Sequence, residues 1–511
     1  MSNPLTTTLT RLAVAACVAG VTLGVTSPGA SAAYDPADPV QKQAYDSAFS
    51  IAQDAYQFGI PLLNMRKTFE NNTSTNVSTG RGFGPVNQFN HFNKLADASD
   101  RAVVAPNSDT LYSIAWLDLS RQPQVIHSVK GTKRFHVLPL MSPYQEDFQN
   151  IGSPGNALPD GDYLVTGPGF TGKVPAGLRR IRSPYNRVWI IGRTYNNGAA
   201  DLAATRKTMN GYKVTPLNRW NPKRPYAYTP PKPKTVDSTV DVKHVVGTGP
   251  GEDPATFFDA LGDELQKFPP PAADAAMLTR IKTLGIGSGL HPTSGGTLSD
   301  PQLQAMRDAV TGGPVRTQGA LAKIFLDGFE AHNGWVALRT GTYGTDYSLR
   351  AVVDKTGLGA PTPDVSVYPI TLTDRDKSPL TGAKRYVAHF ASAPPVKFFW
   401  SMTLYDNDGF FIVNPAKKWL VNDRTGLKTN ADGSFDVYIQ PDAPTDPAQR
   451  TNWLPSPQPT AATTGFRLIA RLYGLTPQGI SGVVSGSGWQ APTVLPCGPD
   501  NKTRTGITCA S

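Results

Sequence analysis

Apolar residues recur at helical intervals near the start of the chain. Within residues 40–66, Tyr45, Phe49, Ala52 and Tyr56 follow one another at spacings of three and four. Because an α-helix completes a turn in about 3.6 residues, side chains with this spacing share one face. The pattern therefore predicts an amphipathic helix that packs this face against a core.

Shorter segments rich in β-branched and aromatic residues follow in two blocks, residues 103–195 and 365–475. Gly, Pro, Asn and Asp separate these segments, which is typical of turns between antiparallel strands. Phe435, Val437 and Ile439 alternate with more polar residues, which predicts a sheet with one buried face. We therefore predict an α+β, mainly β protein with two antiparallel sandwich or barrel domains.

A proline-rich segment and a further helical region lie between the β blocks. Residues 218–235 hold five prolines and five basic residues without an acid, which predicts a stiff linker. Binding of an anionic partner to this linker is the alternative. Asp253-Pro254 and Asp300-Pro301 are typical helix starts and predict a helical insert. The predicted organisation is a leader (1–32), an N-terminal helix and β domain (40–217), a linker (218–252), a helical insert (253–335), a C-terminal β domain (336–490) and a tail (491–511).

The beginning of the chain has the features of an export signal. A single basic residue precedes the apolar stretch 12–25, a Pro-Gly pair follows it, and small residues at 30–32 suit a signal peptidase. We therefore expect cleavage after Ala32, a secreted or cell-envelope location and no membrane span after cleavage. A retained membrane anchor and a lipoprotein attached at Cys17 are the alternatives.

Cysteine usage agrees with export. Loss of the leader would leave two cysteines, Cys497 and Cys509, separated by a loop with glycine and proline. An even number of cysteines in an exported chain favours a disulfide, which would fasten the tail.

Charge and motifs exclude several classes of function. The net charge of +10 is compatible with anionic envelope polymers or lipids, or with solubility alone, and no nucleic-acid recognition motif is present. The seven histidines form no metal-ligand pattern, although His127 and His136 flank a predicted hairpin. We therefore expect no metal, no cofactor and no nucleic-acid partner.

Several motifs resemble known families. The N-terminal motifs, at 103–120, 162–169 and 212–217, are similar to the bacterial domain-of-unknown-function family 1254. The C-terminal motifs, at 394–415 and 466–474, are similar to its usual companion, family 1214. The resemblance implies an exported protein with two jelly-roll-like β domains and implies no activity. One departure is Ser108, which stands where the family commonly has arginine.

The turn and strand that open the first β block contain the strongest candidate for a binding site. A turn with Asn107 and Asp109 leads through Thr110 into a strand that carries Tyr112 and Trp116. Hydrogen-bonding side chains beside aromatic rings suit a sugar-like ligand, and the mouth of a β domain is a common ligand entrance. We therefore predict that these five residues bind a small polar or carbohydrate-like molecule. The alternative is a structural turn whose side chains cap free main-chain amides.

Arg193, at the end of a strand, is a candidate partner for an anionic group of the ligand. A second hypothesis makes the protein a hydrolase or lyase of an envelope or extracellular substrate, with Asp109 as acid or base. Such chemistry needs a second group, and Asp109 could face Asp147, or Asp406 could face Asp423. A third hypothesis is a noncatalytic envelope scaffold. The sequence leaves these alternatives and the oligomeric state open.

Overall fold

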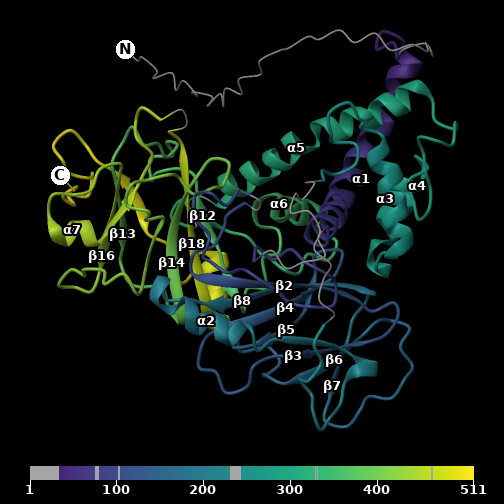
Figure 1. Cartoon of the computed structure of the whole chain (residues 1–511). Helices are drawn as coiled ribbons and strands as arrows, with labels where there is room; N and C mark the ends of the chain where they lie inside the picture. The colour runs from purple at the N-terminus through teal and green to yellow at the C-terminus, as the bar shows by residue number, and fades with distance from the viewer. Residues whose placement is uncertain are drawn as a thin grey trace, which may run out of the picture.

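The chain folds into a mixed α+β protein with 28% helix and 24% strand (Figure 1). Helical residues therefore outnumber strand residues, and the expectation of a mainly β protein is wrong. The predicted leader and part of the predicted linker lie outside the described residues. The computed structural model describes residues 34–74, 80–101, 104–230, 243–328, 330, 332–461 and 464–510.

The predicted N-terminal helix is confirmed as α1, Pro39–Asn72. Its N-cap is Asp38, whose carboxylate accepts hydrogen bonds from the main-chain N–H groups of Val40 and Gln41. These bonds satisfy amides that have no partner inside the helix, and a proline at the first turn fits because its missing N–H costs nothing there. Three helices of the predicted insert pack with α1 in one layer (Figure 1): α3 (Thr256–Lys267), α4 (Ala275–Lys282) and α5 (Asp300–Gly328).

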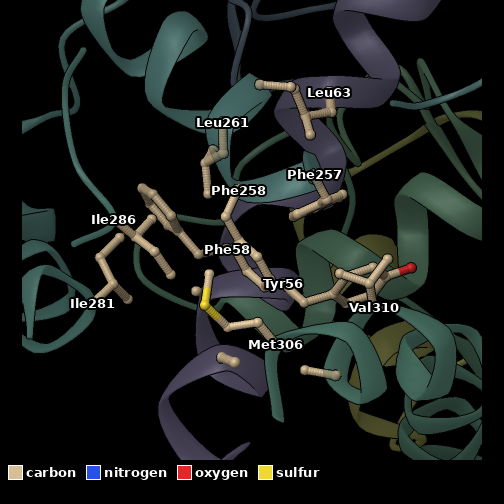
Figure 2. Packing of buried hydrophobic residues seen from close by; sticks show 14 of the residues in the cluster. Tyr56, Phe58, Leu63, Phe257, Phe258, Leu261, Ile281, Ile286, Met306 and Val310 are labelled. Carbon is tan, nitrogen blue, oxygen red and sulfur yellow. The ribbon is translucent and has the colours of Figure 1, made fainter. Parts of the chain in front are cut away.

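Aromatic and aliphatic side chains from α1, α3 and α5 form the core of this helical layer (Figure 2). The rings of Tyr56 and Phe257 stack with centroids 5.1 Å apart, and Phe257 meets Phe258 edge to face. Gly313 of α5 lies so close to α1 that a Cβ at this position would overlap the ring of Tyr56. The two longest helices therefore pack closely because one of them has no side chain at the point of contact.

Two sheets form the N-terminal β half. Their strand orders are β1-β2-β8-β4-β5 and β7-β6-β3-β9, and all neighbours are antiparallel except β6 and β7. Alternate residues of β2, among them Leu111, Ala115 and Leu117, point into the core that the two sheets share. The bounds are β1 (Asn90–His91), β2 (Thr110–Asp118), β3 (Gln124–His127), β4 (His136–Met141), β5 (Asp147–Gly152), β6 (Asp162–Thr166), β7 (Arg179–Arg182), β8 (Arg187–Tyr195) and β9 (Lys213–Pro216), with α2 (Leu202–Met209) after β8.

Two further sheets form the C-terminal β half, with strand orders β10-β12-β18-β14-β15, where β11 also pairs with β18, and β17-β16-β13-β19. Phe435, Val437 and Ile439 point into the core between these sheets, which confirms the predicted buried face. The bounds are β10 (Val336–Ala337), β11 (Ser366–Val367), β12 (Pro369–Thr371), β13 (Tyr386–Phe390), β14 (Val396–Asp406), β15 (Leu420–Asn422), β16 (Phe435–Gln440), β17 (Trp453–Pro455), β18 (Phe466–Leu475) and β19 (Thr493–Pro496), with α7 (Pro447–Thr451) and α8 (Pro477–Ser485) beside them.

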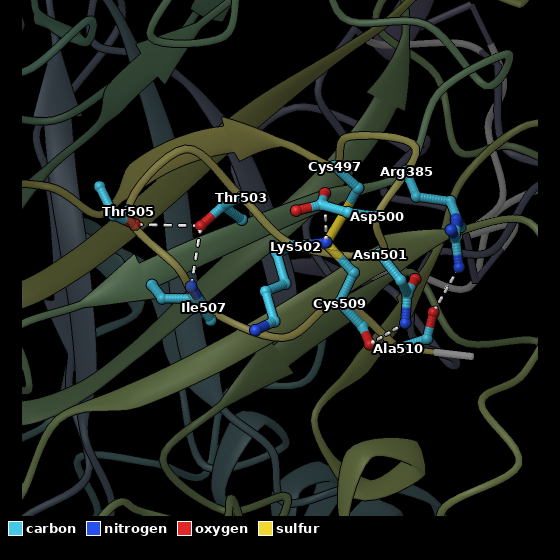
Figure 3. Close-up of a disulfide and its surroundings, with 10 residues drawn as sticks. All are labelled: Arg385, Cys497, Asp500, Asn501, Lys502, Thr503, Thr505, Ile507, Cys509 and Ala510. Carbon is cyan, nitrogen blue, oxygen red and sulfur yellow. Dashed lines mark hydrogen bonds between the residues drawn. A yellow bond between two sulfur atoms is a disulfide. The ribbon is translucent and has the colours of Figure 1, made fainter.

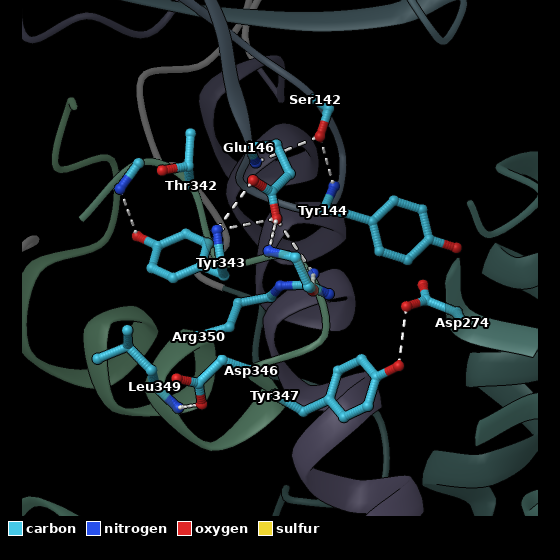
Figure 4. Close-up of polar contacts among 12 residues, drawn as sticks. Ser142, Tyr144, Glu146, Asp274, Thr342, Tyr343, Asp346, Tyr347, Leu349 and Arg350 are labelled. Carbon is cyan, nitrogen blue, oxygen red and sulfur yellow. Dashed lines mark hydrogen bonds and ion pairs between the residues drawn. The ribbon is translucent and has the colours of Figure 1, made fainter. Parts of the chain in front are cut away.

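A partly buried ion pair ties a further helix, α6 (Tyr347–Gly357), to the N-terminal half (Figure 4). Glu146, in the turn between β4 and β5, accepts a hydrogen bond from Arg350 of α6 at 3.1 Å. The same carboxylate accepts the main-chain N–H groups of Tyr343 and Gly344 at 3.0 and 3.1 Å. Arg350 is 2% exposed, so this polar contact fixes the position of α6 from inside the protein.

The C-terminal tail is held by the predicted disulfide between Cys497 and Cys509 (Figure 3). Arg385 adds a hydrogen bond from its guanidinium to the main-chain oxygen of Ala510 at 2.6 Å. The disulfide thus closes the tail on itself, while the pairing of β19 with β13 and the bond from Arg385 attach the tail to the C-terminal half. In the part of the chain that the structure describes, no helix combines the length and the apolar character needed to cross a bilayer.

Candidate functional site

The turn before β2 lies between the two β halves. Ala105 has a positive φ of 52°, a conformation that costs a residue with a side chain on the order of 1 kcal/mol. Contacts with the C-terminal half hold it there: its N–H donates to the oxygen of Gly409 at 2.8 Å, and its own oxygen accepts from Arg471 at 2.9 Å. The next main-chain oxygen, on Pro106, accepts from the hydroxyl of Tyr405 at 2.6 Å. The turn is thus a contact between the two β halves.

Asn107 and Thr110 are both buried within this contact. The side-chain oxygen of Asn107 accepts the main-chain N–H of Asp109 at 2.7 Å, which is the local capping bond that the sequence suggested as an alternative. Its amide nitrogen donates to the hydroxyl of Tyr473, across the domain boundary, at 2.8 Å, and to Thr110 at 3.2 Å. Both polar ends of Asn107 are therefore bonded to protein groups.

Asp109 is 1% exposed, and each of its carboxylate oxygens has a partner in the C-terminal half. Oδ2 accepts from the hydroxyl of Ser401 at 2.5 Å, and Oδ1 accepts from Nη2 of Arg424 at 2.6 Å. Arg424 also pairs with its neighbour Asp423 at 2.7 Å. Burial raises the pKa of Asp423, and the charge of Asp109 adds to this while Arg424 opposes it. One guanidinium therefore forms ion pairs with two carboxylates.

Tyr112 and Arg193 lie together, with the guanidinium carbon 5.5 Å from the centre of the ring. Arg193 is 4% exposed and donates to the main-chain oxygens of Ile191 and Gly359 at 3.0 and 2.6 Å. Trp116 stacks on Trp189 with ring centroids 5.3 Å apart, and Tyr112 packs against the edge of the same apolar cluster. The structure therefore brings Asn107, Asp109 and Thr110 together between the two β halves, and it places Tyr112 with Arg193 at the edge of the cluster in which Trp116 is buried.

The other predicted carboxylates have partners within the protein, some of them distant in the sequence. Asp147 accepts hydrogen bonds from Asn150 and Thr362, and burial raises its pKa to about 7. Asp406 accepts the main-chain N–H of Phe410 at 2.8 Å and so caps its own hairpin. The pair of carboxylates that do share a partner is Asp109 with Asp423, a combination that the sequence did not single out.

A cleft of about 850 Å³ opens beside Ser108, immediately next to the Asp109–Arg424 pair. We call it the proximal cleft. The N-terminal half contributes residues 95–99, Ser108 and residues 196–198, and the C-terminal half contributes residues 413–425 in part. Arg424 lines the cleft, whereas Asp109 lies behind it, so Asp109 influences this space through the arginine.

Asn196 is the most informative polar group in the proximal cleft. It is 2% exposed, its N–H donates to the main-chain oxygen of Asp109 at 2.9 Å, and its amide nitrogen donates to Thr205 at 2.9 Å. Its side-chain oxygen has no hydrogen-bond donor within reach among the described residues. Buried polar atoms are nearly always bonded, so this oxygen is an exception, and it lies just behind the wall of the cleft because it has almost no accessible surface of its own.

The opposite wall carries Lys418 and Trp419. Lys418 donates to the main-chain oxygen of Thr451 at 3.1 Å, and burial lowers its pKa to about 8. The indole N–H of Trp419 donates to the oxygen of Ile412 at 2.8 Å, and its ring stacks on Phe411 at 5.2 Å. Sequence reasoning missed these residues and Asn196. The only local signal is the close spacing of lysine, tryptophan, asparagine and arginine in residues 417–424.

The histidines provide no candidate metal centre. His127 and His136, predicted to meet across a hairpin, instead pair with Asp162 at 2.9 Å and Asp160 at 2.7 Å. Within the described ranges, no group of three or more His, Cys, Asp or Glu residues is close enough to hold a metal ion.

Comparisons with known proteins separate the fold from the function. The VPA0106 protein from Vibrio parahaemolyticus has a similar solved structure, with 21% identity and a TM-score of 0.59 over 88% of this chain and 100% of that one. A putative uncharacterized protein from Burkholderia cenocepacia matches with 13% identity and a TM-score of 0.37 over 85% of this chain and 91% of that one. The first likeness concerns the fold alone. No curated protein matches the chain.

Two family models match, and the proximal cleft lies between the matched regions. Residues 86–216 match "Protein of unknown function (DUF1254)", and residues 365–477 match "Protein of unknown function (DUF1214)". All N-terminal residues that line the proximal cleft fall in the first region, and all C-terminal ones fall in the second. The chain therefore carries a DUF1254 region followed by a DUF1214 region, as the motifs suggested.

Proposed function

We propose that this protein binds a small polar, carbohydrate-like ligand in the proximal cleft between its DUF1254 and DUF1214 regions. The observation that carries the proposal is the cleft between the two regions, whose wall includes Asn196, Asn422 and Arg424. A small rotation of the Asn196 side chain brings its unpartnered oxygen within reach of a ligand hydroxyl, and the bond so formed has a net contribution of about 1 kcal/mol. The volume of about 850 Å³ lies within the range of small-molecule sites, roughly 300–1,000 Å³.

The remaining lining residues suit the same class of ligand. Asn422, Thr425 and Arg424 add hydrogen-bonding groups, and Trp419 adds an aromatic side chain. Sugars present hydroxyls at the ring edge and C–H groups at the ring face, so amides and aromatic rings together recognise them. The ligand site that we propose is therefore displaced from the predicted residues to the wall formed by Asn196 and Arg424.

Asp109 has a positioning role in this proposal. Its carboxylate holds Arg424 against the domain boundary at 2.6 Å, and both of its oxygens already accept hydrogen bonds from the protein. A carboxylate with these partners is a poor acid or base, because proton transfer requires an approach by the substrate. Binding is for this reason the better-supported hypothesis, with hydrolysis or elimination by Asp109 as the weaker one.

We further propose that the protein is exported and acts outside the cytoplasm. The apolar stretch, the small residues before Ala32 and the pair of cysteines support this. We also propose that the strands of each half are connected in the manner of a jelly roll. N-terminal sequencing of protein recovered from the medium or envelope of a natural host tests export, and a mature chain that begins at Met1 contradicts it.

A ligand screen followed by substitution tests the binding proposal. Monosaccharides, disaccharides and sugar acids are screened by thermal shift, and hits are titrated by calorimetry, since a specific ligand raises the melting temperature. Asn196→Ala is expected to weaken the best hit about fivefold, the equivalent of one hydrogen bond of about 1 kcal/mol. The matched control is Asn218→Ala, at an exposed position outside the cleft. Equal affinity in wild type and Asn196→Ala, or no hit, overturns the proposal.

A further inference from the structure

A second cleft adjoins the proximal cleft along the boundary between the two β halves. It has a volume of about 750 Å³, and we call it the distal cleft. Lys133, Tyr195 and Asp201 line it from the N-terminal half, and Lys397, Phe398 and Phe399 line it from the C-terminal half. Asn197 lines both clefts, so the two spaces meet at this residue.

The contacts of Arg424 show that the two clefts are adjacent. It lines the proximal cleft, and its guanidinium carbon lies 4.9 Å from the ring of Tyr195 and 5.2 Å from the ring of Phe399, both of which line the distal cleft. The arginine thus lies at the partition between the two spaces. A ligand that occupies both clefts therefore has to pass Arg424 and Asn197.

Positively charged side chains lie in both clefts, at the two ends of the space that the clefts form together. The acids that line them are neutralised, because Asp201 pairs with Arg134 and Asp97 pairs with Lys94 at 2.8 Å. Lys133 and Lys397 in the distal cleft and Lys417 in the proximal cleft are exposed. Among the described residues no carboxylate lies within ion-pair distance of these three lysines. Unpaired lysines at both ends of a groove favour a ligand with repeated negative charges.

We propose that the two clefts together form one extended groove that binds a linear acidic polysaccharide. This inference rests on the proposed function, because the proximal cleft is the carbohydrate site there. The sugar carboxylates pair with Lys133 and Lys397 at one end and with Lys417 at the other. Asn196 and Asn197 bond hydroxyls in the middle, and the ring of Phe398, whose centre lies 5.4 Å from Nζ of Lys397, supports that lysine in the distal cleft.

The amide and aromatic side chains of the clefts favour an acidic polysaccharide over other polyanions, because they bind the hydroxyls and ring faces of sugars.

Each cleft alone falls in the size range of small-molecule sites, so the two in series accept a chain longer than a single sugar residue. Occupation of both clefts by one chain makes the second contact intramolecular, so a long chain binds more tightly than a short one without any new kind of contact.

Calorimetry with oligogalacturonates of two lengths tests the proposal. The hexamer is expected to bind at least about tenfold more tightly than the dimer, because only the hexamer reaches both clefts. Raising the salt concentration is expected to weaken the hexamer more than the dimer, since more ion pairs are screened. A neutral glucose hexamer measures the contribution of charge.

Substitutions in one cleft at a time measure the contribution of each cleft to binding. In the double variant Lys133→Glu, Lys397→Glu, the hexamer is expected to bind at least about tenfold more weakly, while the dimer, held in the proximal cleft, keeps its affinity. The control is Lys282→Glu, an exposed charge reversal on α4 outside both clefts. Dimer binding that depends on Asn196 but gains nothing from chain length overturns the extended groove and leaves the proposed function intact. Equal binding of the neutral hexamer or of a hexaglutamate peptide overturns the acidic polysaccharide.

Discussion

The carboxylate of Asp109 and the guanidinium of Arg424 are 315 residues apart in the sequence and 2.6 Å apart in the structure. One belongs to the DUF1254 region and the other to the DUF1214 region, and their side chains are 1% and 16% exposed. A charge pair with so little water around it is strong only when both members are present, because either member alone is a desolvated charge. The pair therefore couples the stability of the domain boundary to the shape of the proximal cleft.

Asp109→Asn is expected to lower the free energy of unfolding by roughly 2–4 kcal/mol, because it leaves the guanidinium of Arg424 largely buried without its main counter-charge. Asp423→Asn is the matched control, since it removes the second carboxylate of the same arginine at a site that is 32% exposed. A loss below about 1 kcal/mol is expected there. Urea denaturation of both variants measures the difference, and equal losses contradict a special role for Asp109.

Local patterns in the sequence predicted local structure well. The spacing of three and four residues predicted α1, and alternation predicted the buried positions of β16. The same alternation holds in β2, where Leu111, Ala115 and Leu117 face the core of the N-terminal half while Tyr112 and Trp116 face the other way. These features depend on the geometry of one helix or one strand, which the chain itself encodes.

The candidate site could not be predicted in the same way, because its contacts join distant segments. Trp116 was expected to be available to a ligand, but α1 covers that face of β2, and Phe69 meets the Trp116 ring edge to face at 5.2 Å. The partners of Asp109 come from β14 and from the turn after β15, and no local pattern indicates this pairing. Periodicity shows which residues share a face, whereas tertiary packing decides what covers that face.

Gly313→Ala is expected to destabilise the helical layer by about 2 kcal/mol or more, since the added methyl group overlaps the ring of Tyr56 and forces α1 and α5 apart. Gly312→Ala, one residue earlier in α5, is a control with open space around the new Cβ. There alanine is expected to stabilise the helix by up to about 1 kcal/mol, because glycine is the poorer helix former. Thermal unfolding of the two variants, followed by circular dichroism, should give opposite signs, and two losses of equal size contradict this packing.

Reduction of the Cys497–Cys509 disulfide is expected to lower the free energy of unfolding by at most about 3 kcal/mol, because the bond closes a short loop. In the reduced protein we expect local unfolding to begin at the tail, because the hydrogen bond from Arg385 to Ala510 then acts without the disulfide. Hydrogen exchange compares the oxidised protein with the Cys497→Ser, Cys509→Ser double variant. Faster exchange confined to residues near the tail supports this role, and uniform acceleration across both β halves contradicts it.

Asp147 is expected to make the protein less stable as the pH rises from about 4 to about 7. In an unfolded chain an aspartate has a pKa of about 3.9, whereas burial raises the pKa of Asp147 in the folded protein to about 7. Between these values the folded state holds a proton that the unfolded state has lost, so ionisation on raising the pH opposes folding. Above about pH 7 both states are ionised and the penalty is constant.

The Asp147→Asn variant isolates this effect, since its side chain stays neutral at every pH. Relative to wild type, its free energy of unfolding is expected to improve by about 2 kcal/mol between pH 5 and pH 7, the value of a shift of this size over two pH units. Asp354, whose pKa burial raises to about 6, is unchanged in both proteins and cancels in the difference. Asp327→Asn, at an exposed position of α5, controls for the loss of one negative charge. A wild-type minus variant difference that stays constant from pH 5 to pH 7 contradicts a buried, protonated Asp147.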